Sequence, residues 1–487
     1  MPQTLLEAVM NRTETKSNVL AALTYAVGDL LTKGAKFLLL PVYLAFLSPA
    51  EIGSLAILQA VSLSMTPLFA NGLSSAVSRF YGDHGDDAEN FVAMLFGVGV
   101  TVSGIGVTLI ATVLAGVLPI IDPSLGGGLI ALWMFSGFLR ANSTILERRY
   151  MIRGEAMKYR TLTTLQFALS SVVIIALLSL TELRLSAIAI GEAVGYGSTL
   201  VYLAFGLISG VTKRLSWNAE LTRYVMPLVI HAFAMFGLSY ADRVVLGTLV
   251  PMDRVGVYHV GYLLATVVST IGLAVRAAWL PKFFRDAAAD SSGGEAFSNW
   301  LSGYVGVMTA VAASVLTIVP AGATWIIGPA YAESMDVTRV AAIALVFHSM
   351  MSVLFNPLYY AKRTGRVATI AVTAMVGNIV ALYVLVPPMG IIGGAVASVV
   401  SYATAAMLTG WQASRHYQFR PQRRLWLSNS VVLVTLLVAT LVPQSPTRAV
   451  VAGLIAYAIY AATLVIKPHW FTTADNIERL RRRLRLG

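Results

Sequence analysis

Charged side chains inside long apolar segments are the residues of this chain with the clearest capacity for chemistry. Asp29, Lys33 and Lys36 lie in one apolar run, and their spacing of four and then three residues places them on one face of a helix. A charge in the middle of a membrane helix costs about 2.5–3.5 kcal/mol, so these groups should face a packed interior or water. Lysines beside water would attract a polyanion. The alternative is that they tie the first helix to a neighbour.

Later apolar runs carry a second set of ionisable residues. They are Arg79, Arg140, Glu192, His231, Asp242, Arg243 and Arg276. Taken with the lysines, the set leans cationic, which is typical of a cavity for a pyrophosphate group and opposite to the acidic chamber that a cationic drug would need. Arginine also suits forked contacts to phosphate oxygens. The alternative for Arg79, Arg140 and Arg276 is that they extend to the inner surface.

The remaining members of this set have structural readings as well. Asp242 and Arg243 diverge by about 100° on a helix, so we expect each to bind a different neighbour, in a structural clasp or at a site in the lumen. His231 lies three turns from Asp242 on the same face and is typical of a satisfied polar residue. Glu192 is either a helix-packing contact or a ligand for a coupling ion.

The segments that must position these residues are membrane-spanning helices. The chain is 57% hydrophobic and 12% charged with a mean hydropathy of +0.74, which excludes a soluble globular protein. Crossing a bilayer takes about 20 helical residues. The sequence predicts an all-α polytopic protein with 14 spans, or 12 if the two weak C-terminal runs fail. The predicted spans are 20–46, 52–77, 91–119, 127–147, 162–180, 187–209, 224–249, 256–280, 299–319, 337–360, 367–386, 391–412, 427–442 and 447–466.

The connections between these spans alternate in charge. With both termini and the even connections on one side, that side holds 26 of the 35 Lys and Arg residues and the other side holds 4. Lys and Arg are retained in the cytoplasm during insertion. We therefore predict a multi-pass protein of the inner membrane with both termini cytoplasmic. The net charge of +12 follows from this bias and does not indicate nucleic-acid binding.

Two absences narrow the function. The chain has no cysteine, so disulfides and Cys-ligated metals are excluded, and no cofactor is predicted. No connection is long enough for a soluble domain, which disfavours a membrane enzyme such as a glycan polymerase. Passage through the membrane, with Na⁺ or H⁺ coupling left open, is the favoured function class.

The chain also repeats itself. Leu47–Gly53 resembles Leu249–Gly256, and Arg79–Asp83 resembles Lys282–Asp286, at offsets of about 200 residues. An even number of spans per half predicts parallel repeats related by an axis along the membrane normal. The predicted order is a cytoplasmic segment (1–18), two six-helix bundles around a central cavity (19–215 and 216–415), an extra helix pair (416–466) and a basic cytoplasmic tail (467–487), read as an amphipathic helix on the membrane.

Three stretches resemble a known family. Leu39-Leu-Pro-Val-Tyr43, the middle stretch Tyr240-Ala-Asp-Arg-Val-Val-Leu-Gly247 and Pro388-Met-Gly-Ile-Ile-Gly-Gly-Ala395 are similar to segments of the polysaccharide transporters in the multidrug/oligosaccharidyl-lipid/polysaccharide flippase superfamily. The resemblance extends over residues 20–410 and implies a Wzx-type flippase. Its cargo would be a polyprenyl-pyrophosphate-linked oligosaccharide, passed to the outer leaflet for assembly of lipopolysaccharide or exopolysaccharide, and its partners would be membrane lipids, a polysaccharide polymerase and the chain-length machinery.

By position, the resemblance implies that Lys33, Lys36, Arg79 and Arg276 are lumen cations that hold the pyrophosphate. The two extra C-terminal spans depart from the 12-helix pattern and resemble lipid II flippases, so the choice of glycolipid is left open. An ion-coupled multidrug exporter of the same architecture is the other transport alternative.

Overall fold

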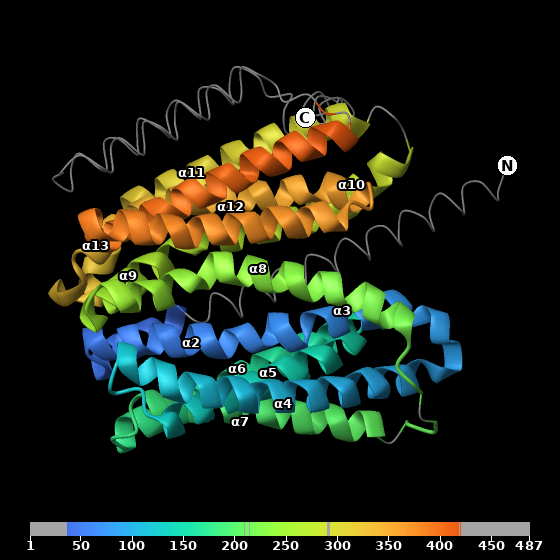
Figure 1. The fold of residues 1–487 in the computed structure, drawn as a ribbon, viewed down its shortest axis with the longest axis horizontal. Coiled ribbons are helices and arrows are strands. Elements are labelled where there is room, and N and C mark those ends of the chain that lie inside the picture. Colours follow the sequence, from blue (N-terminus) through green and yellow to red (C-terminus); the bar gives the residue numbers. More distant parts are fainter. Residues whose placement is uncertain (1–36, 209, 214, 290–292, 418, 420–487) are drawn as a thin grey trace, which may run out of the picture. The chain divides into compact units, whose positions relative to one another are not determined.

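The computed structural model describes residues 37–208, 210–213, 215–289, 293–417 and 419, and every regular element among them is a helix. The helices of the first half are α2 (Pro49–Phe69), α3 (Asn71–Phe80), η1 (Gly82–Asp87), α4 (Ala88–Ile121), α5 (Gly127–Ile152), α6 (Ala156–Leu180) and α7 (Leu185–Ile208). Those that follow are α8 (Ala219–Leu249), α9 (Met252–Ala265), α10 (Val267–Ala289), α11 (Gly293–Ile327), η2 (Pro329–Tyr331), α12 (Ser334–Tyr360) and α13 (Thr364–His416) (Figure 1).

The prediction of an all-α polytopic membrane protein is confirmed. Within the described residues, ten helices are long and apolar enough to cross a membrane, and the apolar helix Phe37–Phe46 is the described end of the first predicted span. The predicted spans 427–442 and 447–466 and the basic tail lie outside the described residues.

Four predicted spans differ in detail from the helices. The run 52–77 is divided at Ala70 into α2 and α3, and the run 256–280 is divided near Thr266 into α9 and α10. Conversely, the last two described spans form one helical stretch, α13, that is interrupted only at Gly390, where φ is +58°. Glycine adopts this left-handed conformation without steric cost, so the chain can change direction there without a loop.

Contacts divide the chain into two compact units. The first contains residues 1–259 and 371–387, and the second contains residues 260–370 and 388–487. The units therefore do not coincide with the predicted bundles, because α8 packs on α2 in the first unit. The predicted boundary at 215/216 is a division by sequence repetition, which the contacts do not test, and it stays a prediction.

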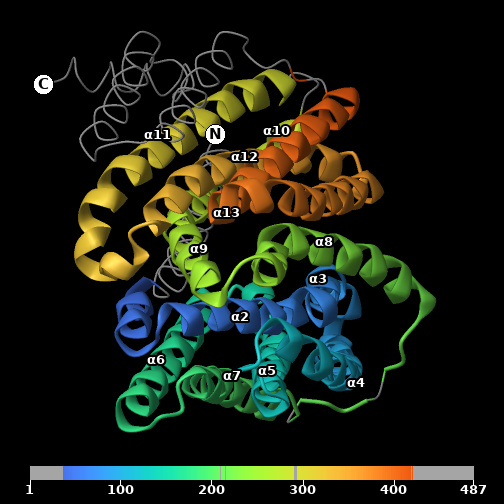
Figure 2. The same cartoon turned by 60° about the vertical axis from the view of Figure 1, so that its left-hand side comes forward.

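In the first unit, α2 lies between α5 and α8 (Figures 1 and 2). Small residues allow the close approach. A side chain at Gly137 of α5 would come within 2.6 Å of the Ser62 carbonyl oxygen on α2, and one at Gly195 of α7 would overlap Ser170 on α6. Membrane helices associate through close packing of this kind, since lipid provides little hydrophobic drive for association.

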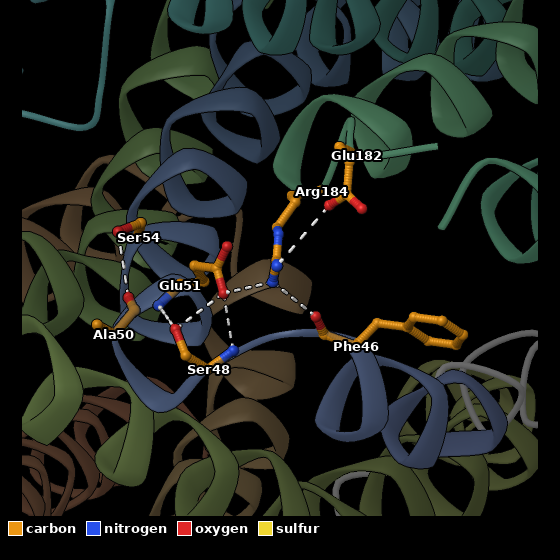
Figure 3. Close-up of polar contacts among 7 residues, drawn as sticks. All are labelled: Phe46, Ser48, Ala50, Glu51, Ser54, Glu182 and Arg184. Carbon is orange, nitrogen blue, oxygen red and sulfur yellow. Dashed lines mark hydrogen bonds and ion pairs between the residues drawn. The ribbon is translucent and has the colours of Figure 1, made fainter. Parts of the chain in front are cut away.

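At the predicted outer end of this unit, a capping box starts α2. The Ser48 and Glu51 side chains each accept a hydrogen bond from the other's backbone N–H, and Pro49 occupies the first turn. Arg184, from the connection between α6 and α7, donates to the Phe46 carbonyl oxygen (3.1 Å) and to Glu51 (3.3 Å) (Figure 3). One arginine thereby fixes the connection between the first two spans.

At the other end of the unit, Glu89 of α4 joins three elements. Its carboxylate accepts hydrogen bonds from Arg149 (2.9 Å), Arg153 and the Tyr81 hydroxyl (2.9 Å). Burial raises the pKa of the Tyr81 phenol above its ordinary value, against the opposing effect of its hydrogen bond with Arg153. The network holds the start of α4 against the end of α5.

The two most similar repeat segments meet within the first unit, where α2 and α9 begin. A side chain at Gly53 would come within 2.0 Å of the Met252 carbonyl oxygen, and one at Gly256 would come within 2.0 Å of the Pro49 carbonyl oxygen. Positions 49 and 252, and positions 53 and 256, each lie 203 residues apart. The contact is thus the same in both directions, as in a two-fold symmetric interface. We call these four residues the glycine crossing.

The glycine crossing predicts that substitution by alanine destabilises the protein at Gly53 and Gly256 but not at a glycine with open space around it. Gly53→Ala or Gly256→Ala should destabilise the protein by about 1–3 kcal/mol, because the added methyl group would overlap a backbone carbonyl oxygen. Gly116→Ala in α4 is the control, since nothing lies within 4 Å of that position and alanine favours a helix. Thermal unfolding in detergent measures the difference. Equal midpoints for the Gly53→Ala and Gly116→Ala variants would contradict the close backbone contact.

Candidate functional site

The structure describes seven of the ten residues that the sequence selects. Asp29, Lys33 and Lys36 lie outside the described residues, so their roles stay predictions. The other seven do not form a single cluster. They form two buried ion pairs, while His231, Arg276 and the exposed Arg79 lie apart from these.

Arg140 of α5 forms a buried ion pair with Glu192 of α7. Its guanidinium also lies 4.7 Å from the centre of the Tyr196 ring, in a cation–π contact. The alternative that Arg140 extends to the membrane surface is wrong, because the residue is only 8% exposed. Glu192 therefore makes a contact between packed helices, and its separate role as a coupling-ion ligand stays a prediction.

Asp242 and Arg243 are both buried in α8 and bind each other. Arg243 Nη1 donates to Asp242 Oδ1 at 2.5 Å, so the prediction that the two residues bind only different neighbours is wrong. The long arginine side chain folds back along its own helix, where Nη1 also donates to the Ser239 carbonyl oxygen. Asp242 Oδ2 accepts from the Tyr258 hydroxyl at 2.5 Å, which ties α8 to α9. This arrangement supports the structural clasp.

His231 and Arg79 are less buried. His231 is half-buried in α8, three turns before Asp242. Arg79, in the last turn of α3, pairs with Asp83 at 3.0 Å, and both side chains are more than half exposed. Surface pairs of this kind contribute little to stability. Arg79 therefore lies at a helix end, as the sequence predicts.

Arg276 has a different kind of partner. Its Nη2 donates to the Oδ1 atom of Asn356 on α12 at 3.3 Å, and within the described ranges it forms no ion pair with a carboxylate. Its Nε atom is buried and has no hydrogen-bond partner among those residues. Tyr304 of α11 and Tyr359 of α12 lie close enough to interact with its charge. Arg276 is thus a half-buried cation whose charge is not neutralised there.

Arg140, Arg243 and Arg276 therefore fall into two classes. Arg140 and Arg243 are each neutralised by a carboxylate, whereas Arg276 contacts only a neutral amide. Asn356 is a site residue that the charge pattern missed, because an asparagine carries no charge. The available signal was an amide side chain just before Pro357, within a predicted span.

No group of three or more His, Asp or Glu side chains that could hold a metal ion comes together in the described part of the chain. Coupling to Na⁺ or H⁺ stays a prediction.

The Arg140–Glu192 pair can be tested through stability. Glu192→Gln should lower the free energy of unfolding by about 3–5 kcal/mol, because it leaves a buried guanidinium without a counter-charge. The double variant Arg140→Met/Glu192→Leu should recover most of this loss. Glu182→Gln is the control, since the Glu182 side chain is 95% exposed, and it should change stability by less than about 0.5 kcal/mol. Similar unfolding curves for the Glu192→Gln and Glu182→Gln variants would exclude a stabilising pair.

Solved transporter structures share this fold. A mutant of the Vibrio cholerae MATE transporter VcmN is 16% identical with a TM-score of 0.57, covering 83% of this chain and 98% of its own. The lipid II flippase MurJ, in an inward closed conformation, is 15% identical with a TM-score of 0.56, covering 94% and 99%. A MATE family multidrug resistance transporter of the MOP superfamily, in an inward-facing conformation, is 13% identical with a TM-score of 0.57, covering 85% and 94%.

At these identities the likeness shows the fold alone, a multi-pass helical membrane fold. No curated protein sequence matches the chain. The family model described as "Polysaccharide biosynthesis protein" matches residues 21–286, more than half of the chain. The chain therefore belongs to the polysaccharide biosynthesis protein family.

Proposed function

We propose that this protein moves a polyprenyl-pyrophosphate-linked oligosaccharide from the cytoplasmic to the outer leaflet of the inner membrane, by alternating access and without bond chemistry. The observation that carries this proposal is that the partner of Arg276 is a neutral amide and not a carboxylate. A half-buried guanidinium in a spanning helix that contacts an amide, with no carboxylate paired to it in the described chain, is suited to an anion that arrives and leaves.

The physical argument is one of compensation. Taking a guanidinium out of water is costly unless a negative charge is close, and a pyrophosphate crossing the hydrocarbon core faces the same cost with the opposite sign. Bringing the two together offsets both. Arginine suits this role because its donors form a rigid fork that matches phosphate oxygens. In this proposal Lys33 and Lys36 supply further positive charge from the first helix.

The family match supports a role in polysaccharide biosynthesis. The bias of Lys and Arg towards one set of connections supports cytoplasmic termini. A polysaccharide polymerase and the chain-length machinery are the protein partners in this proposal.

A lipid II-type flippase is the nearest alternative, and the fold shared with MurJ over 94% of this chain favours it. In both proposals the cargo presents a pyrophosphate group, so the site around Arg276 suits either glycolipid. An ion-coupled multidrug exporter is the second alternative, favoured by the fold shared with MATE transporters. The carboxylates that a cationic drug would need are engaged in ion pairs in the described spans, since Glu192 binds Arg140 and Asp242 binds Arg243.

Arg276→Gln should reduce export of the glycan about tenfold or more, because a charge-assisted contact to phosphate is lost. Arg276→Lys should retain part of the activity. The measurement is the amount of polyprenyl-linked intermediate that accumulates on the cytoplasmic side in a host that lacks the native gene and carries each variant.

Arg339→Gln is the matched control, since Arg339 already pairs with Asp336 at 2.5 Å on its own helix, and it should leave export unchanged. Equal losses of export in the Arg339→Gln and Arg276→Gln variants would contradict the proposal. If Arg276→Gln has no effect on glycan export and the glycan still reaches the surface without the protein, the flippase proposal is refuted and an exporter of cations is the better reading.

A further inference from the structure

The surroundings of Arg276 are built by a close approach of three helices in the second unit. α10, α11 and α12 pack on one another. At Gly272 of α10, an added side chain would come within 2.7 Å of Ser349 Oγ on α12 and 2.9 Å of the Tyr304 hydroxyl on α11. Arg276 lies one helical turn after Gly272, on the same face of α10. The face that carries Arg276 is therefore held close to α12, where Asn356 lies.

Asn356 is a buried polar residue of α12. It is 1% exposed, and its Oδ1 atom accepts the hydrogen bond from Arg276. Its Nδ2 atom is buried and, among the described residues, has no hydrogen-bond partner. An amide nitrogen carries two N–H donors, and burying them without acceptors is costly. Arg276 Nε is a further buried donor without an acceptor in the same part of the chain.

The atoms of this pair that lack a hydrogen-bond partner are therefore donors. The guanidinium of Arg276 and the NH₂ group of Asn356 can donate only, and no carboxylate pairs with Arg276 in the described residues. A ligand that completes the pair must bring several acceptor oxygens and negative charge. A phosphate or pyrophosphate group has both.

We infer that Arg276 and Asn356 form one phosphate-binding subsite, in which the neutral amide of Asn356 determines specificity for an anion. This inference rests on the proposed function and names the residue that keeps Arg276 available for substrate. Asn356 orients the guanidinium through Oδ1, supplies a second donor through Nδ2, and brings no charge that would compete with the phosphate.

The other deep arginines show what a carboxylate at this position would do. Glu192 of α7 neutralises Arg140 of α5, and Asp242 neutralises Arg243 within α8. Asn356→Asp would convert the Arg276 contact into an ion pair of the same type. The side chain would keep almost the same shape, so packing should be preserved while anion binding is lost.

The test uses the purified full chain in detergent, with inorganic pyrophosphate as the probe and isothermal titration calorimetry as the measurement. Asn356→Asp should weaken pyrophosphate binding about tenfold or more, because the added carboxylate occupies the guanidinium and repels the anion. Asn356→Leu should weaken it less, since it removes one donor but leaves the positive charge. A purely structural role for Asn356 predicts the reverse order, with the apolar variant at least as harmful as the isosteric acid.

The chain offers a matched control for the acid substitution. Gln412 near the end of α13 accepts a hydrogen bond from Arg366 through its amide oxygen, in an exposed setting. Gln412→Glu makes the same change of amide to acid beside an arginine and the same change in net charge. It should leave pyrophosphate binding unchanged. If it weakens binding as much as Asn356→Asp does, the effect is one of overall charge and the inference is overturned.

Two further arms separate the sources of the phosphate and the two proposals. Repeating the titration in nanodiscs with phosphatidylglycerol or with phosphatidylcholine should give the same pyrophosphate affinity, whereas competition by phosphatidylglycerol alone would assign the subsite to membrane lipid and overturn its assignment to the cargo.

Loss of pyrophosphate binding in the Asn356→Asp variant, with no glycan export by the wild type, would sustain the subsite and refute the flippase. Export that depends on Arg276 but tolerates Asn356→Asp would refute the role of Asn356 alone. If the acid variant does not fold, unchanged binding by the Asn356→Leu variant refutes that role.

Discussion

The constraint on which this structure depends is the cost of a charge in hydrocarbon. Each deep arginine in the described spans must find a partner, and the partner determines what the arginine can do. Arg140 and Arg243 bind carboxylates, the first across two helices and the second within α8, so both charges are neutralised by structural ion pairs. Arg276 binds the amide of Asn356, so its position is fixed while its charge is kept. The same residue type thus serves packing in one unit and, in our proposal, recognition in the other.

This division suits a transporter. A structural ion pair should be strong and permanent, whereas a binding cation must release its ligand in every cycle. An amide partner meets the second need, because it orients the guanidinium with a weaker hydrogen bond than a carboxylate would form. Gly272 contributes at the level of packing, since its missing side chain lets α11 and α12 approach the helix that carries Arg276. Local sequence, helix packing and electrostatics therefore all contribute to the position and the charge of Arg276.

The sequence predicted the helical class and the positions of the described spans well, because the length of an apolar run is fixed by the thickness of the bilayer. It could not predict partners that lie far apart in the chain, such as Glu192 for Arg140, since spacing shows only which residues share a helix face. The pairing of Asp242 with Arg243 was missed because helix geometry describes where side chains start, not how far a flexible arginine can bend. Asn356 was missed because a search for charge overlooks a neutral residue.

The glycine crossing has a consequence for the history of this chain. Gly53 meets the segment around Met252 in the same way that Gly256 meets the segment around Pro49. A contact that reads the same in both directions is one that a single, half-length polypeptide would make with an identical copy of itself. The crossing is therefore where an ancestral homodimer would have touched before gene duplication and fusion placed both copies in one chain. A backbone-to-backbone contact tolerates almost any later divergence in the surrounding side chains, provided that both glycines remain.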